Sequence, residues 1–268
     1  MSANARQTRQ GVCHLCGQVS RLSFEHIPPK RVFNDRPLVL RTVDDMARRW
    51  KGPSRFRRGM GRRTLCEACN GRTADLYGEA FAEWTRQALS FVGRIGPNPV
   101  LSLPFDIFPL RVLKQVLTMA LAATGAGEPR RCGELQRMIL CPHQRYLPYE
   151  YGVFAYFNPT GGHRLAGNVA VLRTNRGLVN YVLAEVAFPP MGYCVVRLDA
   201  QDPSIPRQEG LCDIGFFSRF GYHERRTVWL TMSKRTPAGP FPLAYPEARH
   251  ETSVDGGSAF VVGRSAEG

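Results

Sequence analysis

The sequence predicts an α+β fold in which a small N-terminal unit precedes helices packed on an antiparallel sheet. Three observations favour this class. Residues 11–75 contain two Cys-x-x-Cys pairs but few large apolar side chains. Residues 74–140 place apolar side chains at helical spacing. From about residue 150, segments rich in β-branched and aromatic residues alternate with turn-forming residues, as in a sheet of short strands.

The N-terminal unit is predicted to span residues 1–75, of which 1–10 are a loose basic arm. Its cysteines occur as Cys13-x-x-Cys16 and Cys66-x-x-Cys69. Two such pairs suit tetrahedral thiolate coordination of a structural Zn²⁺. A unit this small and polar cannot rely on a hydrophobic core, so we expect the metal to organise it.

We expect the chain to be cytoplasmic. Its first residues are polar and lack the apolar core of a signal peptide. No apolar run approaches the roughly 20 residues of a membrane span. Thiols stay reduced in the cytoplasm, where paired cysteines are more often metal ligands than disulfides. The other cysteines are scattered singly, and Cys194 and Cys212 are interpreted as small core residues.

Residues 76–235 are predicted to form a second unit of helices and strands. Apolar periodicity predicts an amphipathic helix over 74–93, a more apolar helix over 105–125 and a short helix over 134–140. An antiparallel meander of five or six strands is expected to pack on the first two helices. Its candidate strands are 151–158, 167–174, 178–188, 192–198, 213–220 and 227–232.

The C-terminal residues 236–268 are dominated by Pro, Gly and Ser, so we expect a loose tail in which 259–263 could add an edge strand.

The charge of the chain favours a polyanionic partner. Net charge is +14, and residues 1–75 hold 16 Lys and Arg against 6 Asp and Glu, whereas the remainder holds 20 against 16. Arg-rich composition alone would not concentrate the excess around the cysteine pairs. We therefore expect nucleic acid as the partner, ahead of an anionic membrane.

A short acidic and basic motif lies between the cysteine pairs. It reads Glu25-His26-Ile27-Pro28-Pro29, and Asn70 directly follows the last cysteine. Cleavage of a phosphodiester needs a base to activate water and a Lewis acid to stabilise charge on the phosphate. Histidine suits the base because its pKa lies near neutral pH. A carboxylate suits a hard divalent cation.

Together these motifs resemble the HNH nuclease superfamily, in particular the HNN-type branch that carries a four-cysteine zinc and includes endonuclease VII. The resemblance covers roughly residues 11–75 and says nothing about residues 100–268. It implies a ββα-metal finger, similar to a treble clef, in which the four cysteines hold the structural Zn²⁺. It also implies a second, catalytic metal, either Mg²⁺ or Mn²⁺.

The resemblance implies a role for each motif residue. His26 matches the general base. Glu25 occupies the acidic metal-ligand position, where Asp is more usual, and Asn70 matches the metal-binding amide. The metal would bridge Glu25, Asn70 and the scissile phosphate. Asn34 is the only asparagine between His26 and Asn70, and it is assigned to the middle position that steadies the loop carrying the base.

A basic insertion at 41–63 carries nine Lys and Arg against two Asp, with Trp50 and Phe56 interleaved. Such residues can contact phosphates and stack on bases, although a solvated basic loop would look the same. Arg72, two residues after Asn70, is expected to reach the scissile strand. The candidate nucleic-acid contacts are Arg48, Arg49, Arg55, Arg57, Arg58, Arg62, Arg63 and Arg72.

The favoured hypothesis is a metal-dependent endonuclease acting on DNA rather than RNA. Residues 76–235 would then select the substrate, bind a protein partner or form a homo-oligomer. One alternative is a zinc module that binds nucleic acid without cleaving it, including a finger that has lost catalysis. Another is a nuclease that stays silent until a C-terminal sensor binds a ligand.

Overall fold

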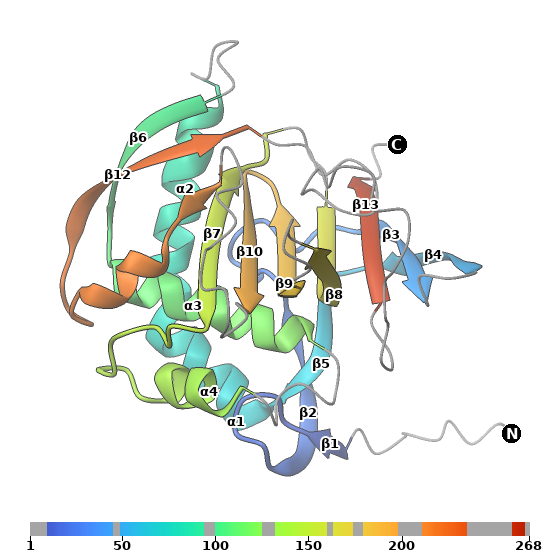
Figure 1. Ribbon diagram of the computed structural model, residues 1–268. Coiled ribbons are helices and arrows are strands. Elements are labelled where there is room, and N and C mark those ends of the chain that lie inside the picture. Colours follow the sequence, from blue (N-terminus) through green and yellow to red (C-terminus); the bar gives the residue numbers. More distant parts are fainter. Residues whose placement is uncertain are drawn as a thin grey trace, which may run out of the picture.

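The computed structural model describes residues 10–44, 49–93, 100–124, 132–159, 163–173, 179–197, 211–234 and 259–265. It is a mixed α and β structure with few helices and antiparallel sheets (Figure 1). None of the described helices combines the length and the apolar character needed to cross a membrane. Predictions that fall on the tail at 236–258 and 266–268 lie outside the described residues.

The cysteine pairs belong to a three-stranded antiparallel sheet of order β1-β2-β5, followed by helix α1. We call this part the cysteine module. It comprises β1 (Gln10–Val12), β2 (Val19–His26), β5 (Gly61–Cys66), α1 (Glu67–Thr73) and the turn that joins β1 to β2. Glu25 pairs with Arg62 and His26 with Gly61, so the acidic and basic motif ends the central strand of this sheet.

The second sheet has eight strands in the order β11-β7-β10-β9-β8-β13-β3-β4, and all its pairings are antiparallel. Strands β8, β9 and β10 form the predicted meander, but β7 pairs with β10 instead of β8. The strands are β3 (Leu38–Asp44), β4 (Arg49–Phe56), β7 (Tyr151–Phe157), β8 (His163–Arg173), β9 (Val179–Phe188), β10 (Met191–Arg197), β11 (Cys212–Asp213) and β13 (Ala259–Ser265).

Most of the basic insertion is a β-hairpin of this large sheet. Strands β3 and β4 pair with each other, and β3 also pairs with β13. The strand expected at 259–263 is present, but it lies between β3 and β8 and not at an edge. The chain therefore leaves the cysteine module after β2, adds two strands to the large sheet and returns for β5. The predicted division at residue 75 stays a prediction.

The helical predictions hold with shifted boundaries. The first helix already begins at Glu67 and runs through α1, the π-helical segment η1 (Ala74–Gly78) and α2 (Glu79–Val92). The prediction of one helix over 105–125 is wrong at its start, because 105–107 end strand β6 (Val100–Ile107) and α3 (Pro109–Ala123) follows. Phe105 and Ile107 are buried and Asp106 is exposed, the period of a strand, and Pro109 suits the first turn of a helix. The short helix is α4 (Gly133–Leu140).

Two predicted strands of the meander are also corrected. Residues 213–220 contain the 3₁₀ helix η3 (Gly215–Arg219) after only two strand residues. The Asp213 carboxylate accepts a hydrogen bond from the Gly215 N–H, which turns the chain and ends the strand. Strand β12 (Arg226–Ser233) forms, but it pairs with β6 in a separate two-stranded sheet beside the large one (Figure 1).

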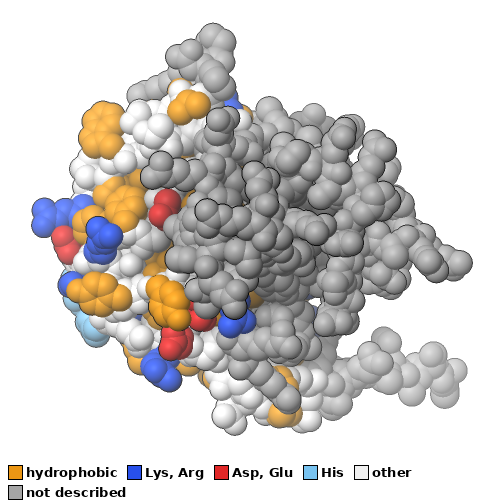
Figure 2. Space-filling view, in the orientation of Figure 1, with side chains coloured by type: hydrophobic (Ala, Val, Ile, Leu, Met, Phe, Trp, Pro, Cys, Tyr) orange, Lys and Arg blue, Asp and Glu red, His pale blue; other side chains and the backbone are white. Residues whose placement is uncertain are grey.

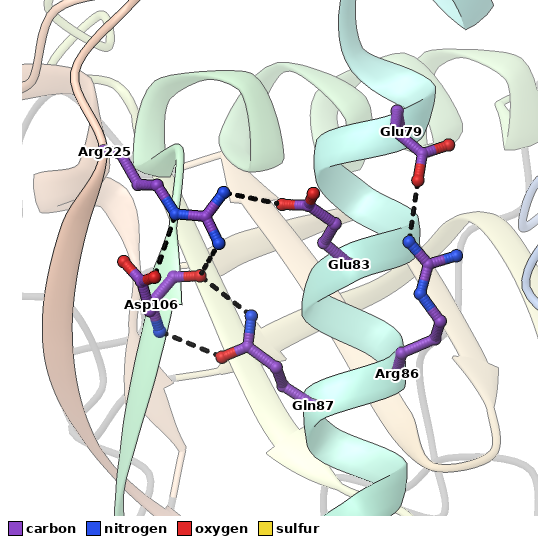
Figure 3. Close-up of polar contacts among 6 residues, drawn as sticks. All are labelled: Glu79, Glu83, Arg86, Gln87, Asp106 and Arg225. Carbon is purple, nitrogen blue, oxygen red and sulfur yellow. Dashed lines mark hydrogen bonds and ion pairs between the residues drawn. The ribbon is translucent and has the colours of Figure 1, made fainter.

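Polar contacts join this two-stranded sheet to α2 (Figure 3). The Arg225 guanidinium donates to Asp106 of β6 and pairs with Glu83 of α2 at 3.4 Å. Gln87 of α2 exchanges hydrogen bonds with the backbone N–H and carbonyl of Asp106. These contacts are exposed and screened by solvent, so they contribute little to the stability of the fold. They do fix the position of α2 relative to β6.

The core forms where α2 and α3 pack on the large sheet. Every α3 residue except Arg111 is buried, including its polar Lys114, Gln115 and Thr118. Trp84 of α2 is fully buried at the centre of an aromatic cluster. Its ring makes edge or tilted contacts with Phe81, Phe105 of β6, Tyr193 of β10 and Phe217 of η3. One side chain therefore joins four separate elements.

Replacing Trp84 by alanine should lower the free energy of unfolding by about 3–5 kcal/mol, because it removes a large buried aromatic side chain and leaves a cavity. Urea denaturation followed by circular dichroism measures the change. Trp229→Ala is the matched control, since Trp229 is 67% exposed and its removal should change stability by less than about 0.5 kcal/mol. Equal losses in both variants would contradict the assignment of the core.

Candidate metal centre and adjoining pocket

The four sulfur atoms of Cys13, Cys16, Cys66 and Cys69 all lie within 4.8 Å of one another. The Sγ atoms of Cys16 and Cys66 are 4.0 Å apart. A tetrahedral Zn²⁺ site with Zn–S bonds near 2.3 Å would space its sulfurs by about 3.8 Å. This cluster could therefore hold a zinc ion with little rearrangement, as the paired spacing predicts.

Two local structures bring the sulfurs together. Cys13 and Cys16 lie in the turn between β1 and β2, which closes through hydrogen bonds from Cys13 N–H to the Gln18 carbonyl and from Gly17 N–H to the Cys13 carbonyl. Gly17 has φ of 72°, a left-handed conformation that glycine adopts without strain. Cys66 ends β5 and caps α1, where its sulfur accepts the Cys69 N–H at 3.5 Å.

Neighbouring groups shift the pKa of three of these thiols. A hydrogen bond from the Cys69 thiol lowers the pKa of Cys13 to about 4, and backbone N–H groups, including that of Cys66 at 3.3 Å, favour the same thiolate. Burial raises the pKa of Cys16, and the hydrogen bond to Cys13 raises the pKa of Cys69. The Cys13 thiolate thus forms easily, while Cys16 and Cys69 lose their protons more readily when a positive charge lies among the sulfurs.

A pocket beside the cysteine module brings the predicted site residues together. Glu25, His26 and Asn70 line it with Lys30 and Arg31. Neighbouring residues of a strand normally point to opposite faces. The register of β2 against β5 shifts between Ser23 and Glu25, and such an irregularity can redirect side chains. Glu25 and His26 themselves pair in regular register with Arg62 and Gly61, and both line the pocket at the end of β2.

Glu25 is buried without a hydrogen-bond partner for its Oε2 atom. Burial raises the pKa of its carboxyl group to about 8, and the nearby Cys13 thiolate adds to the rise. A buried carboxylate of this kind is costly unless a cation or a donor compensates it. The donor set therefore fits a hard divalent ion.

The His26 ring has a defined orientation. Its Nε2 atom donates to the Arg58 carbonyl at 2.8 Å, which leaves Nδ1 as the nitrogen with the free lone pair in the neutral ring. The Phe24 ring packs edge-on against it at 5.0 Å. The imidazole is thus held by β2 and by the segment that leads into β5.

Asn70 holds the start of α1 against β2. Its Nδ2 atom donates to Ser23 Oγ at 3.0 Å and to the Phe24 carbonyl at 3.3 Å. Both contacts use the amide nitrogen, so neither occupies the Oδ1 atom. The amide oxygen is the atom that can bind a cation.

Asn34 is fully buried and ties two segments together. Its Nδ2 atom donates to the carbonyls of Pro28 and Met60, and its Oδ1 atom accepts the Met60 N–H at 2.6 Å. The segment after His26 is thereby fastened to the chain that enters β5. Gly59 permits this approach, because a Cβ there would lie 2.1 Å from the Asn34 carbonyl oxygen and its φ is 91°.

The basic residues have diverse environments. Arg57, Arg58 and Arg63 are exposed, and Arg62 is partly buried on β5. Arg48 and the side chains of Arg49 and Arg55 lie outside the described part of the structure. On the face drawn in Figure 2, Lys and Arg are interspersed with acidic and apolar side chains.

Arg72 does not extend freely from α1 toward the pocket. Its guanidinium donates to the Leu140 carbonyl at the end of α4 at 2.9 Å. Tyr77 and Lys114 donate to the neighbouring carbonyls of Ile139 and Cys141. Arg72 thus has a structural partner that the sequence did not indicate.

Two further observations concern residues near the motifs. His14 lies inside the first Cys-x-x-Cys pair, and its Nδ1 atom donates to the Leu121 carbonyl of α3 at 3.0 Å. Its side chain is not part of the four-sulfur cluster. Gln115 of α3 lines the pocket, although it follows Asn70 by a long stretch of chain. No local motif marks Gln115, so sequence reasoning placed it only within a packing helix.

Comparison with protein-family models, with curated proteins and with solved structures finds no match to this chain. The resemblance to the HNH superfamily therefore stays a prediction that rests on its own motifs and on the geometry above.

The purified chain should contain about one zinc per molecule, measured by mass spectrometry of the metal content. Cys66→Ser should abolish zinc retention, because it removes one of the four converging sulfurs and the cap of α1. Cys141→Ser is the control, since Cys141 is exposed and outside the cluster. Zinc retained at full stoichiometry by Cys66→Ser would exclude the four-sulfur site.

Asn34→Ala should lower the free energy of unfolding of the zinc-loaded protein by about 2 kcal/mol or more, because it leaves buried backbone groups of Pro28 and Met60 unpaired. Urea denaturation measures this loss. Ser90→Ala removes an exposed local hydrogen bond on α2 and should change stability by less than about 0.5 kcal/mol. A wild-type midpoint for Asn34→Ala would show that the segment is held by other contacts.

Proposed function

We propose that this chain is a metal-dependent endonuclease of the HNH type that hydrolyses phosphodiester bonds in DNA. One observation carries the proposal. Glu25, His26 and Asn70, which come from opposite ends of the module's sequence, line one pocket beside the four-cysteine cluster. The succession of β2, β5 and α1 around that cluster supports a ββα-metal finger similar to a treble clef.

His26 is the proposed general base. The Arg58 carbonyl accepts the Nε2 proton and so keeps Nδ1 unprotonated in the neutral ring. Nδ1 can then take a proton from the water that attacks phosphorus. Asn34 supports this role because it holds the segment that follows His26. A base fixed in this way does not have to reorient before each reaction.

Glu25 and Asn70 are the proposed ligands of Mg²⁺ or Mn²⁺. The orphaned Oε2 atom of Glu25 and the unoccupied Oδ1 atom of Asn70 are hard oxygen donors. When bound, the ion supplies charge stabilisation at the phosphate and at the departing 3′ oxygen. The structural Zn²⁺ would bind at the sulfur cluster and not at this site, because thiolates prefer Zn²⁺ and oxygen donors prefer Mg²⁺ or Mn²⁺.

Positive side chains at the pocket support a polyanionic substrate. Lys30 and Arg31 line it and are exposed. Lys30 can reach a phosphate of the backbone, whereas Arg31 pairs with Glu79 at 3.1 Å and would have to exchange that partner. The excess of Lys and Arg in residues 1–75 adds a long-range attraction that does not depend on sequence. DNA is the proposed partner and the cytoplasm the proposed location.

Plasmid nicking tests this function most directly. The zinc-loaded protein should nick supercoiled DNA with Mg²⁺ or Mn²⁺ and should not do so with EDTA. His26→Ala should reduce the rate by about 10² to 10⁴, the contribution typical of a general base. The control His143→Ala changes an exposed histidine outside the pocket and should retain the wild-type rate.

Zinc content and thermal melting of both variants show whether the fold survives. A non-catalytic zinc module would be favoured if the wild-type protein binds DNA without nicking it. Its affinity for DNA would then be the same in His26→Ala and in EDTA. Nicking that appears only after a small molecule is added would favour a nuclease controlled by the C-terminal part. Equal nicking by wild type and His26→Ala would exclude His26 as the base.

A further inference from the structure

Gln115 is a polar residue of α3 in an unusual setting. Its side chain is 1% exposed, and its Oε1 atom has no hydrogen-bond partner. It also lines the pocket that contains Glu25, His26 and Asn70. A buried amide oxygen without a partner is unfavourable, so its retention calls for a specific explanation.

Helix α3 is held firmly against the cysteine module, which fixes the position of Gln115. Thr64 of β5 donates to the Ala122 carbonyl at 2.9 Å, and His14 donates to the Leu121 carbonyl at 3.0 Å. Gln136 of α4 donates to the His14 carbonyl at 2.8 Å. The first two contacts hold the C-terminal end of α3 against the cysteine module, and the third holds α4 against it. Gln115 lies about two helical turns before the first of these contacts, on the same helix.

Two residues that line the pocket thus each carry a buried oxygen atom without a partner, Glu25 Oε2 and Gln115 Oε1. Two acceptors cannot satisfy each other unless the carboxyl group keeps its proton. A hard divalent cation satisfies both at once, because carboxylate and amide oxygens are the donors that it prefers. This pairing distinguishes Gln115 from the other buried polar residues of α3. Lys114 donates to backbone carbonyls, and the Thr118 hydroxyl donates to the Lys114 carbonyl.

We propose that Gln115 Oε1 is a third protein ligand of the divalent cation held by Glu25 and Asn70. The inference rests on the proposed function and adds a residue from outside the cysteine module. The cation site is then completed by α3, so its affinity depends on how α3 docks against β5. The zinc cluster is separate and does not require Gln115.

Mn²⁺ binding to the full-length, zinc-loaded chain tests the inference without measuring cleavage. Electron paramagnetic resonance of free Mn²⁺ gives the dissociation constant. Gln115→Met keeps a similar length and volume but removes the amide, and it should weaken binding about tenfold or more. Thr118→Val is the control, because it is equally buried on α3 and its hydroxyl bonds only within the helix. This control should bind Mn²⁺ as the wild type does.

Glu25→Gln separates the two levels of the proposal. If the wild type and Glu25→Gln differ while Gln115→Met binds as the wild type does, the cation site stands and Gln115 is not a ligand. If the wild type binds no Mn²⁺ in the pocket, the proposed catalytic metal and this inference both fail. Weaker binding by Gln115→Met with unchanged zinc content and an unchanged control supports the inference.

A second variant keeps the test valid if Gln115→Met folds poorly. Gln115→Glu places a second carboxylate beside Glu25, so it should lower the melting temperature in EDTA through like-charge repulsion and desolvation. Mn²⁺ should then raise its melting temperature by more than it raises that of the wild type, because the added charge strengthens ion binding. An Mn²⁺-induced rise no larger than that of the wild type would overturn the proposal.

Discussion

The convergence of four sulfurs is the constraint on which the candidate site depends. Cys13 and Cys16 hold the turn after β1, and Cys66 and Cys69 hold the junction of β5 with α1. Because these two places meet at one point, the residue after Cys69 is brought against β2. Asn70 thus contacts Ser23 and Phe24, immediately before the acidic and basic motif. In a polar unit with a small core, an ion among the sulfurs would supply what packing alone does not.

The second theme is the distribution of unsatisfied polar atoms. In the segment between β2 and β5, the buried Asn34 has hydrogen-bond partners for both its amide nitrogen and its amide oxygen. The buried oxygens of Glu25 and Gln115 have no partners, and both residues line the same pocket. Buried atoms without partners also occur elsewhere, as at Trp84 Nε1 in the aromatic core. The pocket differs in that two of its lining residues each carry an unpaired oxygen acceptor, which a cation could satisfy.

The large sheet is coupled to the cysteine module through the chain and through α3. The β3–β4 hairpin leaves the module, joins the sheet beside β13 and returns at β5. Helix α3 packs on β9 and β10 and also reaches the module through its last carbonyls. Helix α3 therefore contacts both the large sheet and the cysteine module, and its Gln115 lines the pocket.

The sequence by itself determined what depends on short spacing. The cysteine pairs, the helix of residues 134–140 and the strands near 151, 179 and 191 follow from local periodicity and turn residues, which act within a few positions. The motifs around Glu25 and Asn70 were also visible, since each is contiguous. Only the tertiary structure decided the partner of β12, the contact of Arg72 with α4 and the position of Gln115. These features arise where distant segments compete for the same buried surface, and a local pattern carries no information about which segment will lie opposite.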